Sequence, residues 1–264
     1  MTGLAAPSPI GAPIGAFIEY GLFKTLAKWR ARLLSALRRT AADPVRTRYG
    51  VLMRANWRDR TFQYCYHATY GRVLADYLTD QRRPFSFVDI GANQGLYSLI
   101  AAANPHCRTV TAFEPVAATF ARLADNIALN GDSEKVCAVD AAVSLESGTA
   151  TIATDAAHSG TASLRHGGAG GETIRILGIA DVDAAIDERF PLVVKVDVEG
   201  HEETVIEALA ASTHLPRIAA IFYEVDRRWT DAAAIEARLR GAGFARFTRY
   251  GFGRHYDVLA ERAS

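Results

Sequence analysis

The sequence lacks the features that mark several classes of protein. Its three cysteines, Cys65, Cys107 and Cys137, are odd in number and far apart, which matches neither a zinc site nor a disulfide framework. It has no uninterrupted apolar run approaching the roughly 18 residues of a transmembrane helix, and its first residues lack the pattern of a secretory signal. We therefore expect a reducing compartment and a cytoplasmic protein, with the inner face of the membrane as an alternative location.

An excess of one charge is also lacking. The 30 Lys and Arg residues balance 29 Asp and Glu residues, for a formal net charge of +1. Without a basic excess the protein is not drawn to nucleic acid, so no nucleic-acid partner is expected. Hydrophobic residues make up 49% of the chain, which excludes a wholly disordered protein.

The first 44 residues read as an extension of the main domain. Residues 1–13 are small and Pro-rich, and we expect them to be disordered. Residues 14–41 predict a basic amphipathic helix, which ends at Asp43-Pro44. Its apolar face either docks on the main domain, associates with another copy, or lies on an anionic membrane surface; a transit peptide is the least favoured alternative. The apolar stripe consists of Ile18, Leu22, Leu26, Trp29, Leu33 and Leu37.

From residue 85 onward strands and helices alternate, which predicts an α/β fold with a mainly parallel sheet and helices on both faces. Before it, residues 45–84 form a polar, aromatic-rich segment with a short helix at 72–79. Residues 149–179 read as a hairpin-like insertion around a Gly-rich stretch that lacks the Lys-Ser/Thr of a phosphate loop. Strands are expected at 85–90, 108–113, 135–143, 191–198, 217–225, 244–250 and 255–261, and helices at 96–103, 116–129, 202–211 and 231–241, with the last two strands antiparallel.

Three strand ends carry the pattern of a nucleotide-type cofactor site. The first expected strand ends in Asp89 and a tight turn from Gly91 to Gly95 that enters a helix. Ligands of doubly wound sheets bind at such carboxyl ends, and glycine allows a close approach of the backbone. Glu114 ends the next strand about 20 residues later, where a carboxylate holds ribose hydroxyls. Asp140-Ala141 ends the third strand and is a candidate border of an adenine.

The fourth and fifth strands end in a cluster of charged residues. The segment 195–202 reads KVDVEGHE, and Glu224 follows at the end of the next strand. Buried charge is costly unless it is paired, so this density suggests a reactive site. The alternative is a structural salt-bridge network around Lys195.

Together these segments resemble the FkbM family of S-adenosylmethionine-dependent methyltransferases. The resemblance is carried, in the family's order, by VDIGANQG (88–95), FEP (113–115), NIALN (126–130), AAVS (141–144), KVDVEGHE (195–202) and Glu224. It implies a Rossmann-like class I methyltransferase fold with seven strands, one of them antiparallel. It also implies O-methylation of a hydroxyl on a sugar, glycan or specialised metabolite, with residues 45–84 as an acceptor-side cap before a methyltransferase domain at 85–264.

The resemblance and the strand ends give a set of candidate site residues. Asp197 is the first candidate for the catalytic base, with Glu199, His201 and Glu224 as its neighbours. Alternatively, Asp197 and Glu224 end adjacent strands and ligate one cation, for which oxygen ligands favour Mg²⁺. The candidates for binding S-adenosylmethionine are Asp89, Gly91, Asn93, Gly95, Glu114, Pro115, Asp140 and Ala141.

Two other functions are compatible with parts of the sequence. One is an oxidoreductase that binds NAD or a nucleotide sugar, which the missing third glycine of the dinucleotide fingerprint and the acid at Asp89 disfavour. The other is a catalytically inactive binding protein with a methyltransferase fold, which the complete set of cofactor motifs disfavours.

Overall fold

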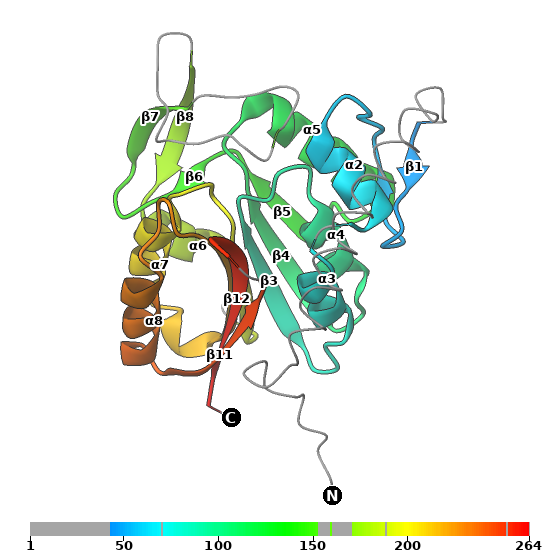
Figure 1. Ribbon diagram of the computed structural model, residues 1–264. Helices are drawn as coiled ribbons and strands as arrows, with labels where there is room; N and C mark the ends of the chain where they lie inside the picture. The colour runs from blue at the N-terminus through cyan, green and yellow to red at the C-terminus, as the bar shows by residue number, and fades with distance from the viewer. Residues whose placement is uncertain are drawn as a thin grey trace, which may run out of the picture.

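A seven-stranded sheet covered by helices on both faces forms the centre of the molecule (Figure 1). The computed structural model describes residues 43–69, 71–152, 159, 171–187, 189–251 and 253–263. The expected disordered start at 1–13 and the basic amphipathic helix at 14–41 lie outside these residues. No helix in the described part of the chain is long and apolar enough to cross a membrane.

The order of the strands in the sheet is β11-β12-β10-β9-β3-β4-β5. In the part of the chain described, β12 is the one strand of this sheet that runs against its neighbours, β10 and β11, while the other pairs are parallel. This confirms the predicted Rossmann-like fold. The strands are β3 (Phe85–Ile90), β4 (Cys107–Phe113), β5 (Val136–Val139), β9 (Leu192–Val196), β10 (Ile218–Asp226), β11 (Phe244–Tyr250) and β12 (His255–Arg262).

Side chains that alternate along the strands build a separate apolar core on each face of the sheet. Phe87 belongs to the core beneath one set of helices, and its neighbour Val88 belongs to the core on the other side. The first core packs against α3 (Arg72–Thr79), α4 (Leu96–Ala103) and α5 (Ala117–Asn130), and the second against α6 (Ile179–Ala185), α7 (Glu202–Ala210) and α8 (Ala232–Gly241). Strands buried on both faces read as continuous apolar runs, which is why β3 and β9 were recognisable from sequence.

The segment before the sheet folds onto the first core. It contains β1 (Val45–Arg46), β2 (Leu52–Met53), α2 (Arg60–His67) and α3. Helix α3 has the predicted bounds, whereas α2 was not predicted because its sequence, RTFQYCYH, lacks a run of strong helix formers. Its start is fixed instead by the side chain of Asp59, which accepts a hydrogen bond from the backbone of Thr61.

The insertion after β5 is a small sheet of its own, with the order β6-β8-β7. Strands β7 (Gly148–Ile152) and β8 (Glu172–Leu177) pair antiparallel, as expected for a hairpin. The prediction of one continuous strand at 135–143 is wrong. The chain turns at Asp140 and Ala141, and β6 (Ala142–Val143) leaves the main sheet to pair with β8. The three strands stand at the top of Figure 1, above the main sheet.

Two asparagines of α5 fasten the segment before the sheet to the rest of the molecule. Asn126 is fully buried; its side-chain oxygen accepts a hydrogen bond from the backbone of Arg54 at 2.7 Å, and its amide donates to the carbonyl of Gln94 at 2.8 Å. One turn later, Asn130 bonds both backbone groups of Leu52. These contacts give a structural role to both asparagines of the NIALN segment.

We predict that Asn126→Ala lowers the free energy of unfolding by about 1–3 kcal/mol, because the amide of Arg54 and the carbonyl of Gln94 lose their partner in a buried place. Urea denaturation measures this loss. Asp125→Ala, one residue earlier on the exposed side of α5, is the control and should change the stability by less than about 0.5 kcal/mol. Equal stability of the two variants would contradict the assigned role.

Candidate active site

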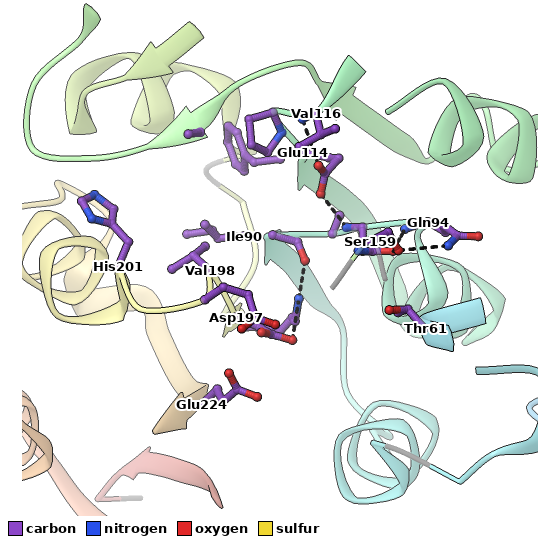
Figure 2. A pocket seen from close by; sticks show the side chains of 18 of the residues that line it. Thr61, Ile90, Gln94, Glu114, Val116, Ser159, Asp197, Val198, His201 and Glu224 are labelled. Atoms are coloured by element: carbon purple, nitrogen blue, oxygen red, sulfur yellow. Dashed lines mark hydrogen bonds and ion pairs between the residues drawn. The ribbon is translucent and has the colours of Figure 1, made fainter. Parts of the chain in front are cut away.

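A cavity of about 250 Å³ opens where the parallel strands end at their carboxyl side. It is lined by residues at and after the ends of β3, β4 and β9, by single residues of β10 and β12, and by residues of α2, α4 and the insertion. Figure 2 shows Glu114 at one end of this cavity and Glu224 at the other, with Asp197 between them. This is the edge of the sheet at which the sequence placed its candidate residues.

The turn from Gly91 to Gly95, here called the glycine loop, lies against the end of β9. Gly91 has a φ of +80°, and a Cβ at this position would lie 2.0 Å from the carbonyl oxygen of Asp197. Glycine is therefore required for this close approach. Asn93 also has a positive φ, of 51°, and its side-chain oxygen accepts a hydrogen bond from the backbone of Gln94 at 2.8 Å.

Glu114 holds the glycine loop from the neighbouring strand. One carboxylate oxygen accepts a hydrogen bond from the backbone of Asn93 at 2.9 Å, and the other accepts from the backbone of Val116 at 3.0 Å. Burial raises the pKa of this carboxyl to about 7, and the two backbone donors oppose the rise. Each oxygen keeps a lone pair for a further donor, so the group suits a ligand that offers two hydroxyls.

A buried lysine joins the glycine loop to the end of β9. Lys195 is 3% exposed; its ammonium group donates to the carbonyl of Gly91 at 2.5 Å and pairs with Asp89 at 3.2 Å and Asp197 at 3.7 Å. Burial lowers the pKa of Lys195, but the charges of Asp89 and Asp197 outweigh it and the net shift is upward. The lysine therefore stays charged and fixes both acids.

Three carboxylates meet at the other end of the cavity. One oxygen from each of Asp197, Glu199 and Glu224 lies within 4.8 Å of the other two. Burial, with Asp197 and Glu224 nearby, raises the pKa of Glu199 to about 9, so this side chain is protonated at neutral pH. The loop that carries Glu199 is held by Glu202, whose carboxylate accepts hydrogen bonds from the backbone of Val198 and Gly200.

A histidine from the antiparallel strand completes the carboxylate end. Nε2 of His255 lies 2.5 Å from Oε1 of Glu224. Burial and the charge of Asp197 raise the pKa of Glu224 to about 7, while His255 opposes the rise. The hydrogen bond to Glu224 in turn raises the pKa of His255 above its ordinary value. The protonation of each group therefore depends on the other.

The structure brings most of the candidate residues to one cavity. All four candidates for catalysis line it, although Nε2 of His201 lies 3.2 Å from Ser144 Oγ, and Figure 2 shows His201 apart from Asp197 and Glu224. Of the cofactor candidates, Gly91, Asn93, Glu114, Pro115 and Ala141 line the cavity. Three do not line it, namely Asp89, Gly95 and Asp140.

These three residues have other positions. Asp89 is fully buried beneath the glycine loop, where it pairs with Lys195 and accepts a hydrogen bond from Ser98 at 2.7 Å. Gly95 adopts the left-handed conformation at the start of α4, and a Cβ there would meet Leu123 at 2.5 Å. Asp140 is exposed, and its carbonyl accepts a hydrogen bond from Arg175.

Several cavity residues were not identified from the sequence. His255 comes from the closing strand, and nothing in its own neighbourhood of the sequence marks it. Ile152 and Ile174 from the insertion form an apolar wall with Val116. Thr61, Tyr64 and Cys65 line the cavity from α2. His255 starts β12, which was expected to pair with β11, but its pairing with β10 beside Glu224 was not predicted.

Comparison with known proteins gives a family match and a fold match. The sequence profile described as "Methyltransferase FkbM domain" matches residues 89–246. A search of curated proteins found no match. Among solved structures, the methyltransferase FkbM from Methylobacillus flagellatus KT superimposes with a TM-score of 0.50 at 16% identity, over 89% of this chain and 58% of that one. The METTL16 MTase domain gives 0.51 at 13% identity, over 89% and 80% of the two chains. At these identities the structural matches establish the fold alone.

We predict that the pKa of His255, followed by NMR of its ring protons, lies above the ordinary histidine value of 6.5. Glu224→Gln removes the negative charge that stabilises the imidazolium, so the pKa should fall. Asp226→Asn is the control: Asp226 lies opposite His255 in the strand pair but bonds Arg228, so its replacement should lower the pKa less. An unchanged pKa in Glu224→Gln would contradict the pairing.

Proposed function

Since this chain belongs to the FkbM family of methyltransferases, we propose that it transfers a methyl group from S-adenosylmethionine to a hydroxyl oxygen of a sugar, a glycan or another specialised metabolite. The observation that carries the proposal is a single cavity with two chemically distinct ends. Glu114 and the glycine loop form one end, and the cluster of Asp197, Glu199 and Glu224 forms the other. One end suits a nucleoside and the other suits removal of a proton.

The residues at the Glu114 end fit this cofactor. The carboxylate of Glu114 would accept hydrogen bonds from two ribose hydroxyls, and the apolar side chains of Val116, Ile152 and Ile174 suit a flat adenine. When bound, S-adenosylmethionine supplies a methyl group activated by the positive charge of its sulfur. The chain itself contributes binding, alignment and proton removal, and alignment accounts for much of the acceleration in a bimolecular transfer.

The carboxylate end supports a neutral hydroxyl as the methyl acceptor. Three carboxyl groups and no Lys or Arg other than the paired Lys195 line this part of the described cavity. A phosphate or carboxylate next to the reacting oxygen would meet negative charge there. We assign the base to Asp197, because Glu199 is held protonated and Glu224 is engaged with His255. The side chain of Asp197 is 23% exposed.

A divalent cation is the alternative way to activate the hydroxyl. The oxygens of Asp197, Glu199 and Glu224 lie close enough together to share one ion, and oxygen ligands favour Mg²⁺. The two mechanisms differ in their response to chelation, which the second experiment below uses. Contact with an anionic membrane stays a prediction, because the basic helix expected at residues 14–41 lies outside the described part of the chain.

The first experiment is a calorimetric titration with S-adenosylhomocysteine. We expect binding that tightens as the pH rises through about 7 and then levels off. The reason is that ribose hydroxyls stabilise the ionised form of Glu114, whose pKa is about 7 in the free protein, so binding lowers this pKa and releases a proton. Glu114→Gln should weaken binding tenfold or more and remove this part of the pH dependence.

Two results would contradict the cofactor assignment. One is the absence of S-adenosylhomocysteine binding by the wild-type protein. The other is binding of NAD under the same conditions, which would favour an oxidoreductase. The control for Glu114→Gln is Glu203→Gln, which makes the same change of charge at an exposed position on α7. This variant should bind S-adenosylhomocysteine like the wild type.

The second experiment tests Asp197 in methyl transfer. A panel of hydroxylated sugars and glycans is incubated with radiolabelled S-adenosylmethionine, and the most active member serves as the acceptor. Asp197→Asn keeps the shape of the side chain but not its charge, so turnover should fall about 10²-fold or more. Exhaustive chelation should leave the wild-type rate unchanged if Asp197 acts as a base and abolish it if Asp197 is a metal ligand. Full activity of Asp197→Asn would exclude both roles.

A further inference from the structure

A second buried acid, Asp59, lies behind the cavity and has no part in the function proposed above. It is fully buried at the start of α2. Its first role is local, because Oδ1 accepts a hydrogen bond from the backbone of Thr61 at 3.0 Å and caps the helix. The capping role explains the hydrogen bond from Thr61 but not the hydrogen bonds that the same carboxylate accepts from other parts of the chain.

Besides a local contact with the side-chain amide of Asn56 at 3.5 Å, the carboxylate of Asp59 has contacts with two distant parts of the chain. Oδ2 accepts a hydrogen bond from the side-chain amide of Gln94, in the glycine loop. Ser159 bonds the same carboxylate twice, through its hydroxyl at 2.7 Å and its backbone at 3.2 Å. Figure 2 shows Ser159 beside Gln94, with Thr61 close below them. A buried carboxylate with this many donors is held firmly in one position and holds its donors in turn.

A chain of hydrogen bonds continues from Gln94 to the acid that faces the nucleoside end. The backbone of Gln94 bonds the side chain of Asn93, and the backbone of Asn93 bonds Glu114. Asn93 has a positive φ, which asparagine adopts more readily than most residues with a side chain, and the bonds to Gln94 and Glu114 hold it in this conformation. Ser159 Oγ lies 3.1 Å from Oδ1 of Asn93 and so adds a second contact to the same residue.

We propose that Asp59 is a positioning residue for the cofactor. Through Gln94 it fixes the glycine loop, and through this loop it fixes Asn93 and Glu114. It also couples the glycine loop to α2, whose side chains form the facing wall of the cavity. The proposal rests on the proposed function in one respect, namely that the ligand of the glycine loop is S-adenosylmethionine or its product. Asp59 does not line the cavity, so it acts through Gln94 and not by touching the ligand.

The first test compares S-adenosylhomocysteine affinities by calorimetry. Asp59→Asn keeps a good helix cap but replaces charge-assisted hydrogen bonds by neutral ones and makes the amide of Gln94 rotate in order to accept from position 59, so binding should weaken about tenfold. Asp59→Ser also keeps the cap but is too short to reach Gln94, and it serves as a second variant if Asp59→Asn does not fold. The matched control is Asp231→Asn, which changes the capping acid of α8 and should leave the affinity unchanged.

A reciprocal exchange separates positioning from general destabilisation. In the double variant Asp59→Asn/Gln94→Glu, the amide at position 59 donates to the carboxylate at position 94, so the bond is restored with its direction reversed. We expect the double variant to regain most of the lost affinity, whereas Gln94→Glu alone places two carboxylates together and binds weakly. If the bond between positions 59 and 94 does not contribute to affinity, the double variant should bind no better than the weaker of the two single variants.

The second test follows the coupling to α2 by hydrogen exchange. Binding of S-adenosylhomocysteine should slow backbone exchange at residues 60–67 in the wild type and not in Asp59→Asn. The inference is wrong if Asp59→Asn and Asp59→Ser both bind within twofold of the wild type, or if the reciprocal exchange restores nothing. A wild-type protein that does not bind S-adenosylhomocysteine would instead overturn the proposed function, so the two failures are distinct.

Discussion

A buried ammonium group sets the geometry on which the whole cavity depends. Lys195 lies on β9, between β3, which leads into the glycine loop, and β10, which carries Glu224. Burying its charge is tolerable only because Asp89, Asp197 and the carbonyl of Gly91 surround it. The same contacts set how far the glycine loop and the carboxylate cluster stand from each other. The Glu114 end and the carboxylate end of the cavity are thus parts of one electrostatic unit, in which Asp89 pairs with the lysine that joins them and does not line the cavity itself.

The sheet and the acidic end of the cavity could be predicted from the sequence because their signals are local. A strand buried on both faces is an uninterrupted apolar run, and its carboxyl end is marked by the first acid or glycine that follows. Parallel strands bring such ends to one edge, so Asp197 and Glu224 were expected together, and they are. The resemblance to a known family supplied the fold type, with seven strands and one of them antiparallel, whereas the order of the strands comes from the structure.

The positions of the remaining site residues depend on the direction in which turns lead the chain and on the pairing of strands that are far apart in the sequence. Local sequence patterns do not encode either. His201 follows Asp197 closely in the chain, yet the turn between them directs it to Ser144. His255 lies far along the chain but enters the site because β12 runs antiparallel beside β10. Asp140 ends a strand like Glu114 does, but the chain departs there toward the insertion. Asp59 was not identified because α2 was not predicted: its sequence lacks a run of strong helix formers, and the capping residue is its only signal.

The shared apolar core beneath α3 and α4 constrains how such a protein diversifies. Met53, Trp57 and Phe62 belong to the same cluster as Phe87 of the sheet, so the segment in front of the sheet cannot be exchanged between relatives as an independent module. Thr61 and Tyr64 are different, because they face the cavity and are only half-buried. Substitutions at Thr61 and Tyr64 would therefore reshape one face of a short helix at the cavity, whereas Phe62 on the same helix is constrained by the stability of the fold.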